Sequence, residues 1–148
     1  MKLSINWLKD YISLNKSVDE IADSLTMIGN EVEEIMTTGD IPGVIVAEIK
    51  EIIPHPNADK LQLTKIYDGK NTLSVVCGAP NIKEGQKIFL ATIGTNLPDP
   101  NNNSYFEIKK SKIRGELSEG MICSEKELGI SDDHEGIMVL PNDYELGV

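Results

Sequence analysis

The sequence predicts a mainly β fold, a closed or partly closed barrel of short strands preceded by a small N-terminal α/β segment. Beyond residue 43, short apolar stretches alternate with glycine- and proline-containing turns, which is typical of barrels. Before residue 38 the apolar residues instead recur with helical spacing. A chain of 148 residues can bury one core and a small appendage, but not two full domains.

The N-terminal segment is expected to contain a short strand and a brief first helix. Asn6 is expected to be the N-cap of this helix, because its side chain can accept a hydrogen bond from a free backbone N–H. The spacing of Trp7, Leu8 and Tyr11 places them on one helical face. A face this small cannot be buried alone, so it must pack on other parts of the protein.

A second helix is predicted after Ser17, which forms a capping box with Glu20 three residues later. Gly29 supplies the C-terminal stop. Ile21, Leu25 and Ile28 are expected to lie on one face of this helix. Residues 31–36 are interpreted as a strand. We expect this segment to be loosely held.

The glycines and the proline of residues 38–43 mark the boundary to the barrel. The strands that follow are predicted at residues 44–53, 61–67, 73–77, 88–93, 105–108, around 113 and at 120–123, with a last short apolar segment at 137–140. Residues 68–71 predict a hairpin turn, since Asp-Gly and Asn tolerate positive φ. Residues 97–104 are expected to form an exposed loop. Ser124 is expected to cap one helical turn that ends at Gly129.

The charge distribution argues against general attraction to nucleic acid, because the chain carries a net charge of −10. The negative charge is concentrated at the two ends. Residues 1–39 hold three basic and seven acidic side chains, and residues 125–148 hold one basic and seven acidic ones. Residues 40–124 hold ten of each. A local positive face can therefore form in the middle of the chain.

Catalysis by this chain alone is not expected. His55 and His134 are the only histidines, and neither stands in an order typical of an activated nucleophile. No glycine-rich loop with a lysine is present for ATP phosphates. Asp132, Asp133, His134 and Glu135 are interpreted as a solvated acidic loop rather than a metal site. Cys77 and Cys123 have no paired spacing and are interpreted as small buried residues, which fits a reducing cytoplasm.

The candidate binding residues are the cations Lys109, Lys110, Lys112 and Arg114. If the stretch is extended, the last three share one strand face, because side chains alternate with period two. Cations on one face of a barrel strand can follow a phosphate backbone. Lys60 could extend this face in the folded barrel. The charge pattern alone leaves RNA binding and a solvated, solubilising face about equally favoured.

Aromatic residues make up only 5% of the chain, and Tyr105 and Phe106 are the candidates for base stacking beside the basic run. One of them is expected to face the core if the strand alternates. Gly115 and Gly120 are interpreted as turn or bulge positions where backbones approach closely. The site is therefore expected to read backbone shape and charge more than base sequence.

Three stretches carry a family resemblance. Residues 112–129, KIRGELSEGMICSEKELG, resemble the end of the tRNA-binding OB domain of several aminoacyl-tRNA synthetases. The stretches HPNADKL at 55–61 and VVCGAPN at 75–81 support the match. The start, MKLSINWLKDYI, resembles that of the bacterial phenylalanyl-tRNA synthetase beta subunit. The family has Arg-Gly-Val-x-Ser where this chain has Glu116 after Gly115, and this carboxylate lowers the local positive potential.

The resemblance implies a five-stranded OB-fold barrel at 39–148 and an incomplete neighbouring domain at 1–38. It implies tRNA as the partner of Lys60, Lys109, Lys110, Lys112 and Arg114, with no DNA and no membrane. The parent enzyme would be a cytoplasmic ligase of two alpha and two beta subunits that charges tRNA with phenylalanine, using ATP and magnesium. The fragment itself would hold no cofactor and no catalytic residue.

Two alternatives remain open at this point. The barrel can be a structural or protein-interaction module of the synthetase without significant RNA affinity, which the charge and the low aromatic content favour. A free-standing tRNA-chaperone OB protein is the other alternative, which the Trp7-Leu8-Lys9 start disfavours.

Overall fold

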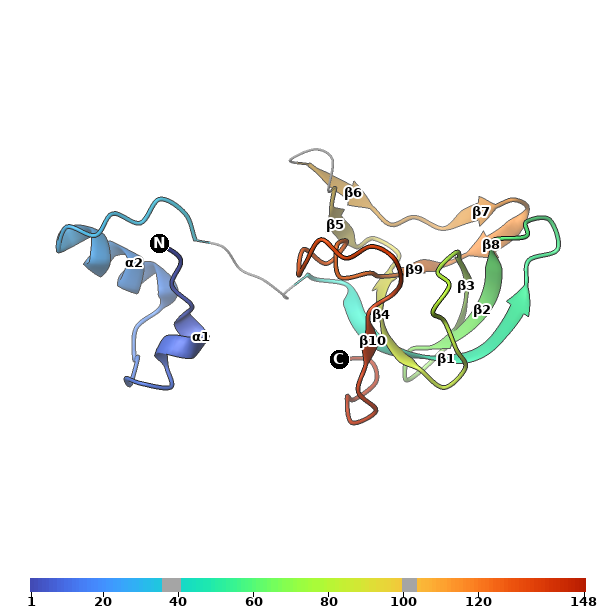
Figure 1. The fold of residues 1–148 in the computed structure, drawn as a ribbon, viewed down its shortest axis with the longest axis horizontal. Coiled ribbons are helices and arrows are strands. Elements are labelled where there is room, and N and C mark those ends of the chain that lie inside the picture. Colours follow the sequence, from blue (N-terminus) through green and yellow to red (C-terminus); the bar gives the residue numbers. More distant parts are fainter. Residues whose placement is uncertain (36–40, 100–103) are drawn as a thin grey trace. The chain divides into compact units, whose positions relative to one another are not determined.

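The computed structural model describes residues 1–35, 41–99 and 104–148, and the chain divides into two compact units, Met1–Thr37 and Thr38–Val148 (Figure 1). The first unit holds two helices, and the second is built almost entirely of antiparallel strands. In the described part of the chain, no helix is long and apolar enough to cross a membrane.

The first unit contains α1 (Ile5–Leu8) and α2 (Val18–Met27). The cap of α1 is Ser4 and not Asn6, because the Ser4 side chain accepts from the Trp7 N–H and Asn6 already lies inside the helix. The strand expected at residues 31–36 is not formed at residues 31–35, and residue 36 lies outside the described residues. The expected short strand before α1 is also not formed, since residues 1–4 lie in no regular element.

The capping box of α2 is confirmed. The Ser17 hydroxyl oxygen accepts from the Glu20 N–H, and the Glu20 carboxylate accepts from the Ser17 N–H at 2.8 Å. Gly29 follows the helix with φ of 95°, as a C-terminal stop requires. However, neither helix buries any residue, and Trp7 and Tyr11 stay 58% and 69% exposed. Ile21 and Leu25 are half-buried, and Ile28 is 74% exposed.

The second unit is a nearly closed antiparallel barrel, consistent with the predicted OB-fold. Its main strands are β1 (Val44–Pro54), β2 (Gln62–Tyr67), β3 (Thr72–Cys77), β4 (Lys87–Thr92) and β9 (Gly120–Ile122). The sheet order is β10-β4-β1-β2-β3, with β9 also paired to β4. The short β10 (Val139–Leu140) joins the edge of β4 (Figure 1).

Closure of the barrel depends on the contact between β3 and the β8–β9 segment. The Glu119 N–H donates to the Ser74 carbonyl at 2.8 Å, and the Val76 N–H donates to the Ser118 hydroxyl oxygen at 3.1 Å. Gly120 allows the close approach of β9 to β4, since a Cβ there would lie 2.9 Å from the Ala91 carbonyl oxygen. The structural interpretation of Gly120 is confirmed.

The barrel interior is apolar and holds fully buried side chains such as Ile49, Ile66, Ile88 and Leu90. A second cluster joins Leu97, Ile108 and Cys123. The expectation that residues 97–104 form an exposed loop is wrong at Leu97, which is fully buried in β5 (Asn96–Pro98). Residues 100–103 lie outside the described residues.

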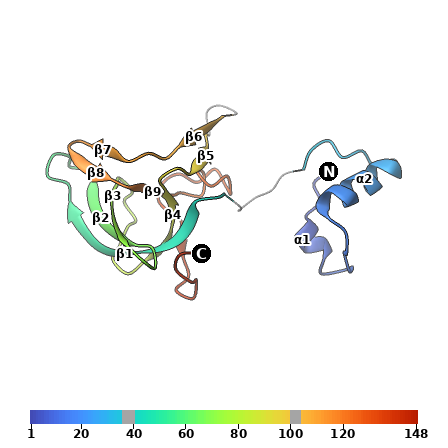
Figure 2. The same ribbon diagram turned by 180° about the vertical axis from the view of Figure 1, so that it is seen from behind.

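Two small hairpins extend from the barrel between β4 and β9. β5 pairs with β6 (Tyr105–Glu107), and β7 (Ser111–Ile113) pairs with β8 (Glu116–Ser118). The β1–β2 loop, residues 55–61, lies beside the β7–β8 hairpin in both views (Figures 1 and 2). These two elements carry most of the predicted binding residues.

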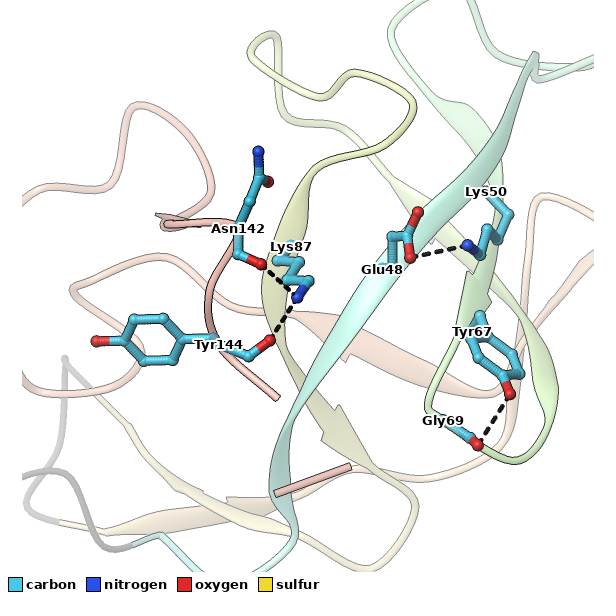
Figure 3. A network of polar contacts seen from close by, with 7 residues as sticks. All are labelled: Glu48, Lys50, Tyr67, Gly69, Lys87, Asn142 and Tyr144. Atoms are coloured by element: carbon cyan, nitrogen blue, oxygen red, sulfur yellow. Dashed lines mark hydrogen bonds and ion pairs between the residues drawn. The ribbon is translucent and has the colours of Figure 1, made fainter. Parts of the chain in front are cut away.

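After β9 the chain forms turns rather than the expected short helix. Ser124 still caps this segment, because its hydroxyl oxygen accepts from the Glu127 N–H while the Glu127 carboxylate accepts from the Ser124 N–H at 2.6 Å. The C-terminal segment is held by Lys87, whose ammonium donates to the carbonyls of Asn142 and Tyr144 (Figure 3). These bonds place the acidic end of the chain against β4.

Candidate nucleic-acid interface

The β7–β8 hairpin turns through two residues, Arg114 and Gly115. Ile113 pairs with Glu116, and φ is 50° at Arg114 and 90° at Gly115. Positive φ at both central residues is the pattern of a type I′ turn, which matches the twist of the flanking strands. Gly115 adopts this conformation without steric cost, whereas Arg114 is the only non-glycine residue with positive φ in the described part of the chain.

This turn corrects the expected placement of the cations. β7 is only three residues long, so Lys112 lies in the strand, Lys110 precedes it and Arg114 lies in the turn. The three side chains therefore do not share one strand face. They instead lie along one short exposed segment that runs into the tip of the hairpin.

Two of the five predicted cations form ion pairs. The Lys109 ammonium lies 3.4 Å from the Glu107 carboxylate, with both side chains well exposed. The Lys110 ammonium lies 3.1 Å from the Glu119 carboxylate. Bonding to Lys110, and then to the Ser74 N–H, lowers the pKa of Glu119. Exposed pairs are weak, so a phosphate can compete for these lysines, but it must displace a carboxylate.

The remaining predicted cations, Lys60, Lys112 and Arg114, form no ion pair within residues 1–35, 41–99 and 104–148. All three residues are exposed. An unpaired, solvated cation can meet a phosphate without losing a partner. These three residues are therefore the better candidates for direct phosphate contact.

Lysines on the main barrel strands have other roles. The Lys50 ammonium lies 2.8 Å from the Glu48 carboxylate and 5.6 Å from the centre of the Tyr67 ring. The Tyr67 hydroxyl in turn donates to the Gly69 carbonyl (Figure 3). The Lys65 ammonium donates to the Ser74 hydroxyl oxygen at 2.7 Å. These side chains bond within the barrel and serve as internal comparisons for the hairpin.

The structure brings Lys60 to the hairpin through its loop. The His55 Nε2 lies 3.0 Å from the Ile113 carbonyl oxygen, and the Asn57 side-chain amide donates to the Arg114 carbonyl at 3.4 Å. The β1–β2 loop and the β7–β8 hairpin are thus directly bonded. The sequence reasoning used His55 and Asn57 only as part of a family motif and missed this contact.

A groove of about 880 Å³ is lined in part by the basic segment, residues 109–114. Its lining includes Lys109, Ser111, Ile113, Lys126 and His134. Residues of β3 and β9 also line it. Lys60, Lys110, Lys112 and Arg114 are not among the described residues that line this groove.

The aromatic residues beside the basic run are both accessible. Tyr105 is 74% exposed and Phe106 is 36% exposed, so the expectation that one of them faces the core is wrong. Ile108 takes that role and is buried in the second cluster. Because β6 belongs to a separate two-stranded hairpin, its alternation does not point into the barrel.

The described residues also bear on two further kinds of site, a metal site and a reactive thiol. No group of three or more His, Cys, Asp or Glu side chains there could hold a metal ion. Cys77 and Cys123 are buried, as expected. Burial raises the pKa of the Cys123 thiol to about 12 and also raises that of Cys77, so both thiols stay protonated and unreactive at neutral pH.

Comparison with known proteins gives three findings. Residues 44–148 match a family described as a putative tRNA binding domain. The chain is 50% identical over 149 aligned residues to the phenylalanine–tRNA ligase beta subunit of Geobacter metallireducens, covering 100% of this chain and 18% of the relative. The corresponding subunit of Photorhabdus laumondii is 47% identical over 150 residues, again covering 100% of this chain and 18% of the relative.

Among solved structures, a variant of the Naegleria gruberi RNA ligase with ATP and Mn is similar with a TM-score of 0.50. The match covers 66% of this chain and 32% of that one at 15% identity, so it supports the fold alone. The chain spans 18% of the length of the curated relatives named above. The similarity to them extends over both units of the chain.

Proposed function

The chain belongs to the family of putative tRNA-binding domains, and from this premise we propose that its barrel binds tRNA through the β7–β8 hairpin and the β1–β2 loop. Lys60, Lys112 and Arg114 make the main phosphate contacts, because each is exposed and unpaired in the described residues. Lys109 and Lys110 contribute less, since each already has a carboxylate partner. The observation that carries the proposal is the direct bonding of the two cationic elements.

The affinity of the isolated chain for tRNA is expected to be modest. The net charge of −10 repels a polyanion, so binding depends on a local contact of few cations. Each phosphate contact on a single strand contributes about −0.7 to the slope of log K against log salt. Three contacts therefore predict a slope of roughly −2.

For the longer protein, we propose the activity that its relatives' name states, the ligation of phenylalanine to tRNA. In that setting the chain is a non-catalytic module of the beta subunit, beside an alpha subunit and in the cytoplasm. ATP and magnesium belong to the parent enzyme, and we assign no residue of this chain to them. The 50% identity to a beta subunit over all of this chain supports the proposal.

A structural role for the barrel within the synthetase is the second candidate. The net charge and the two ion-paired lysines favour it, because they reduce the charge that an RNA would meet. The two functions differ in one observable, the affinity of the chain for RNA. A scaffold barrel needs none.

The test is a fluorescence anisotropy titration of the chain with phenylalanine tRNA at 50 mM and 150 mM salt. The variant Lys60→Ala/Lys112→Ala/Arg114→Ala removes the three unpaired cations. The matched control Lys50→Ala/Lys65→Ala/Lys70→Ala removes the same charge from the main barrel strands and the β2–β3 turn. We expect the wild type and the control to bind with a slope of roughly −2, and the first variant to lose binding.

Equal losses in both triple variants would show that only total charge matters, and the assigned site would be wrong. Absence of binding by the wild type at 50 mM salt would favour the structural role. Circular dichroism of each variant verifies that the barrel remains folded. These positions are exposed or partly exposed, so large unfolding effects are not expected.

We further propose that residues 1–38 belong to a separate small domain, whose apolar face is covered by chain beyond residue 148. The lack of any buried residue in α1 and α2 supports this. Amide hydrogen exchange tests it, because helices without burial open easily. Fast exchange is expected across residues 21–28, and uniform protection there would contradict the proposal.

A further inference from the structure

We propose that His55 and Asn57 are positioning residues, which hold the β7–β8 hairpin against the β1–β2 loop so that Lys60, Lys112 and Arg114 can meet one RNA backbone together. This inference rests on the tRNA-binding function proposed above. It assigns a role to two residues that carry no charge and that need not touch the RNA.

The β1–β2 loop is ordered by its own hydrogen bonds. The His55 N–H donates to the Leu61 carbonyl at 3.1 Å, which closes the loop at its base. The Leu61 N–H donates to the Ala58 carbonyl at 3.3 Å, which forms a turn around Lys60. Lys60 therefore projects from a closed loop whose two ends are fixed by β1 and β2. Such a loop is a defined support for the hairpin beside it (Figure 2).

The His55 ring bridges the loop and the hairpin. His55 is buried, with 6% of the residue's surface exposed. Its Nδ1 lies 3.0 Å from the Asn57 backbone N–H and must accept this hydrogen bond. The proton of the neutral ring is then on Nε2, which donates to the Ile113 carbonyl at 3.0 Å. Nδ1 thus bonds to the β1–β2 loop, and Nε2 bonds to the β7–β8 hairpin.

Asn57 adds a second bond at the adjacent hairpin residue. Its Nδ2 donates to the Arg114 carbonyl at 3.4 Å and lies 4.0 Å from the position of a Cβ on Gly115. The loop therefore holds two successive carbonyls of the hairpin backbone, just before and within the turn. Because these contacts use only backbone groups of the hairpin, the side chains of Lys112 and Arg114 remain available.

The hairpin needs such support because it is small. β7 and β8 contain three residues each, and all three residues of β7 are exposed. A two-stranded hairpin of this size is marginally stable without further packing. β8 is anchored to β3 by the bond from the Val76 N–H to the Ser118 hydroxyl oxygen. The exposed β7 and the turn lack this support, so without the bonds from His55 and Asn57 they would have to be ordered on binding, which weakens affinity.

Two substitutions of His55 separate its two bonds. In His55→Gln the amide nitrogen reaches about as far as Nε2 and can still donate to the Ile113 carbonyl. In His55→Asn the shorter side chain reaches only as far as Nδ1. It therefore keeps the bond to the Asn57 N–H and loses the bond to the Ile113 carbonyl of the hairpin. Both variants replace the ring by an amide, which makes them matched controls for burial.

The experiment is the tRNA titration described above, with the amide signals of Arg114 and Gly115 followed by NMR. We expect His55→Gln to bind within about threefold of the wild type. His55→Asn is expected to bind roughly tenfold more weakly, with a salt slope about 0.7 shallower, because one phosphate contact is lost. Its Arg114 and Gly115 amide signals are expected to shift or broaden.

Asn57→Ala keeps the test independent of folding, because Asn57 is exposed and its side chain lies outside the core. We expect a loss of about threefold in affinity. Wild-type affinity and slope in both His55→Asn and Asn57→Ala would overturn the inference, as would equal weakening in His55→Gln and His55→Asn. Absence of binding by the wild type would overturn the proposed function itself, and the inference with it.

Discussion

Lysines on the main strands of the barrel and cations on the β7–β8 hairpin carry the same charge in different surroundings. The Lys87 ammonium donates to the carbonyls of Asn142 and Tyr144, so its charge holds the C-terminal segment. Lys112 and Arg114 form no ion pair with any described residue. The same residue type thus stabilises the fold in one region and is available to a ligand in the other.

On the proposed site, local partners matter more than net charge in deciding where this acidic protein binds RNA. A cation that already donates to carbonyls or pairs with a carboxylate must lose that contact before it meets a phosphate. Lys112 and Arg114 avoid this cost because neither pairs with a carboxylate of the described residues. The following predictions test this comparison.

The largest effect is expected from the unpaired hairpin cations. Lys112→Gln/Arg114→Gln should lower tRNA affinity roughly fiftyfold at 50 mM salt, since two phosphate contacts are removed. Lys109→Gln/Lys110→Gln removes the same charge from the ion-paired lysines and should lower affinity only severalfold. Anisotropy titrations of both variants measure the difference. Equal losses would mean that the ion pairs do not distinguish these lysines.

Arg114→Asn is expected to change stability and binding in opposite directions. Asparagine adopts positive φ more readily than arginine and precedes glycine in preferred type I′ turns, so the variant should gain about 0.5 kcal/mol in unfolding free energy. It removes one phosphate contact and should bind tRNA about eightfold more weakly at 50 mM salt. Urea denaturation and anisotropy titration measure the two effects.

Arg114→Lys is the control, because it keeps the charge and the strained turn. Its stability and affinity should stay near the wild-type values. If Arg114→Asn bound tRNA as well as the wild type, the arginine at this position would have no role in binding. The strained φ would then have no functional explanation.

Lys87→Met tests the other side of the comparison. The loss of two hydrogen bonds to the C-terminal segment should lower the unfolding free energy by about 1 kcal/mol. Amide exchange in residues 142–147 should become faster, while tRNA affinity should change less than twofold. A loss of binding comparable to that of the hairpin variants would show that Lys87 also contacts the RNA.

The sequence predicted the main barrel strands because their apolar residues are numerous and bounded by glycine and proline. β1, β2, β3 and β4 were expected within one or two residues of their observed ends. β5 and β8 were missed, although three other strands of three residues, β6, β7 and β9, were expected close to their observed positions. Leu97 stands among proline, aspartate and asparagine and was therefore interpreted as part of a loop, although it is fully buried.

The sequence likewise predicted only part of the candidate site. The cations were found from their spacing, but their pairing depends on tertiary contacts such as that of Lys110 with Glu119. The bond from His55 to Ile113 joins residues 58 positions apart. No local pattern contains that information. The type I′ turn could have been expected from Arg114-Gly115 only if arginine were a usual residue at positive φ.

Glu119 connects the two regions, because its carboxylate pairs with Lys110 of the basic segment and accepts from the Ser74 N–H of β3. These contacts lower its pKa below the ordinary 4.5. A lowered folded-state pKa gives stability that is present above the unfolded value and is lost as pH falls through the folded one. The wild type should therefore be slightly more stable than Glu119→Gln at pH 6, and this difference should shrink below pH 4.5.

The substitution Glu119→Gln should slightly increase the affinity for tRNA. This is the smallest change in affinity predicted for these variants, and it is an increase, whereas the hairpin variants lower the affinity. Glu119→Gln removes one negative charge and leaves Lys110 unpaired, so the salt slope should steepen by up to about 0.7 and affinity should rise about twofold. Urea titrations between pH 3 and pH 7 measure the first effect, and anisotropy titrations measure the second. A pH-independent difference in stability would show that the carboxylate is not ionically linked to Lys110. Unchanged affinity would mean that Lys110 lies outside the RNA contact and that Lys60, Lys112 and Arg114 form it alone.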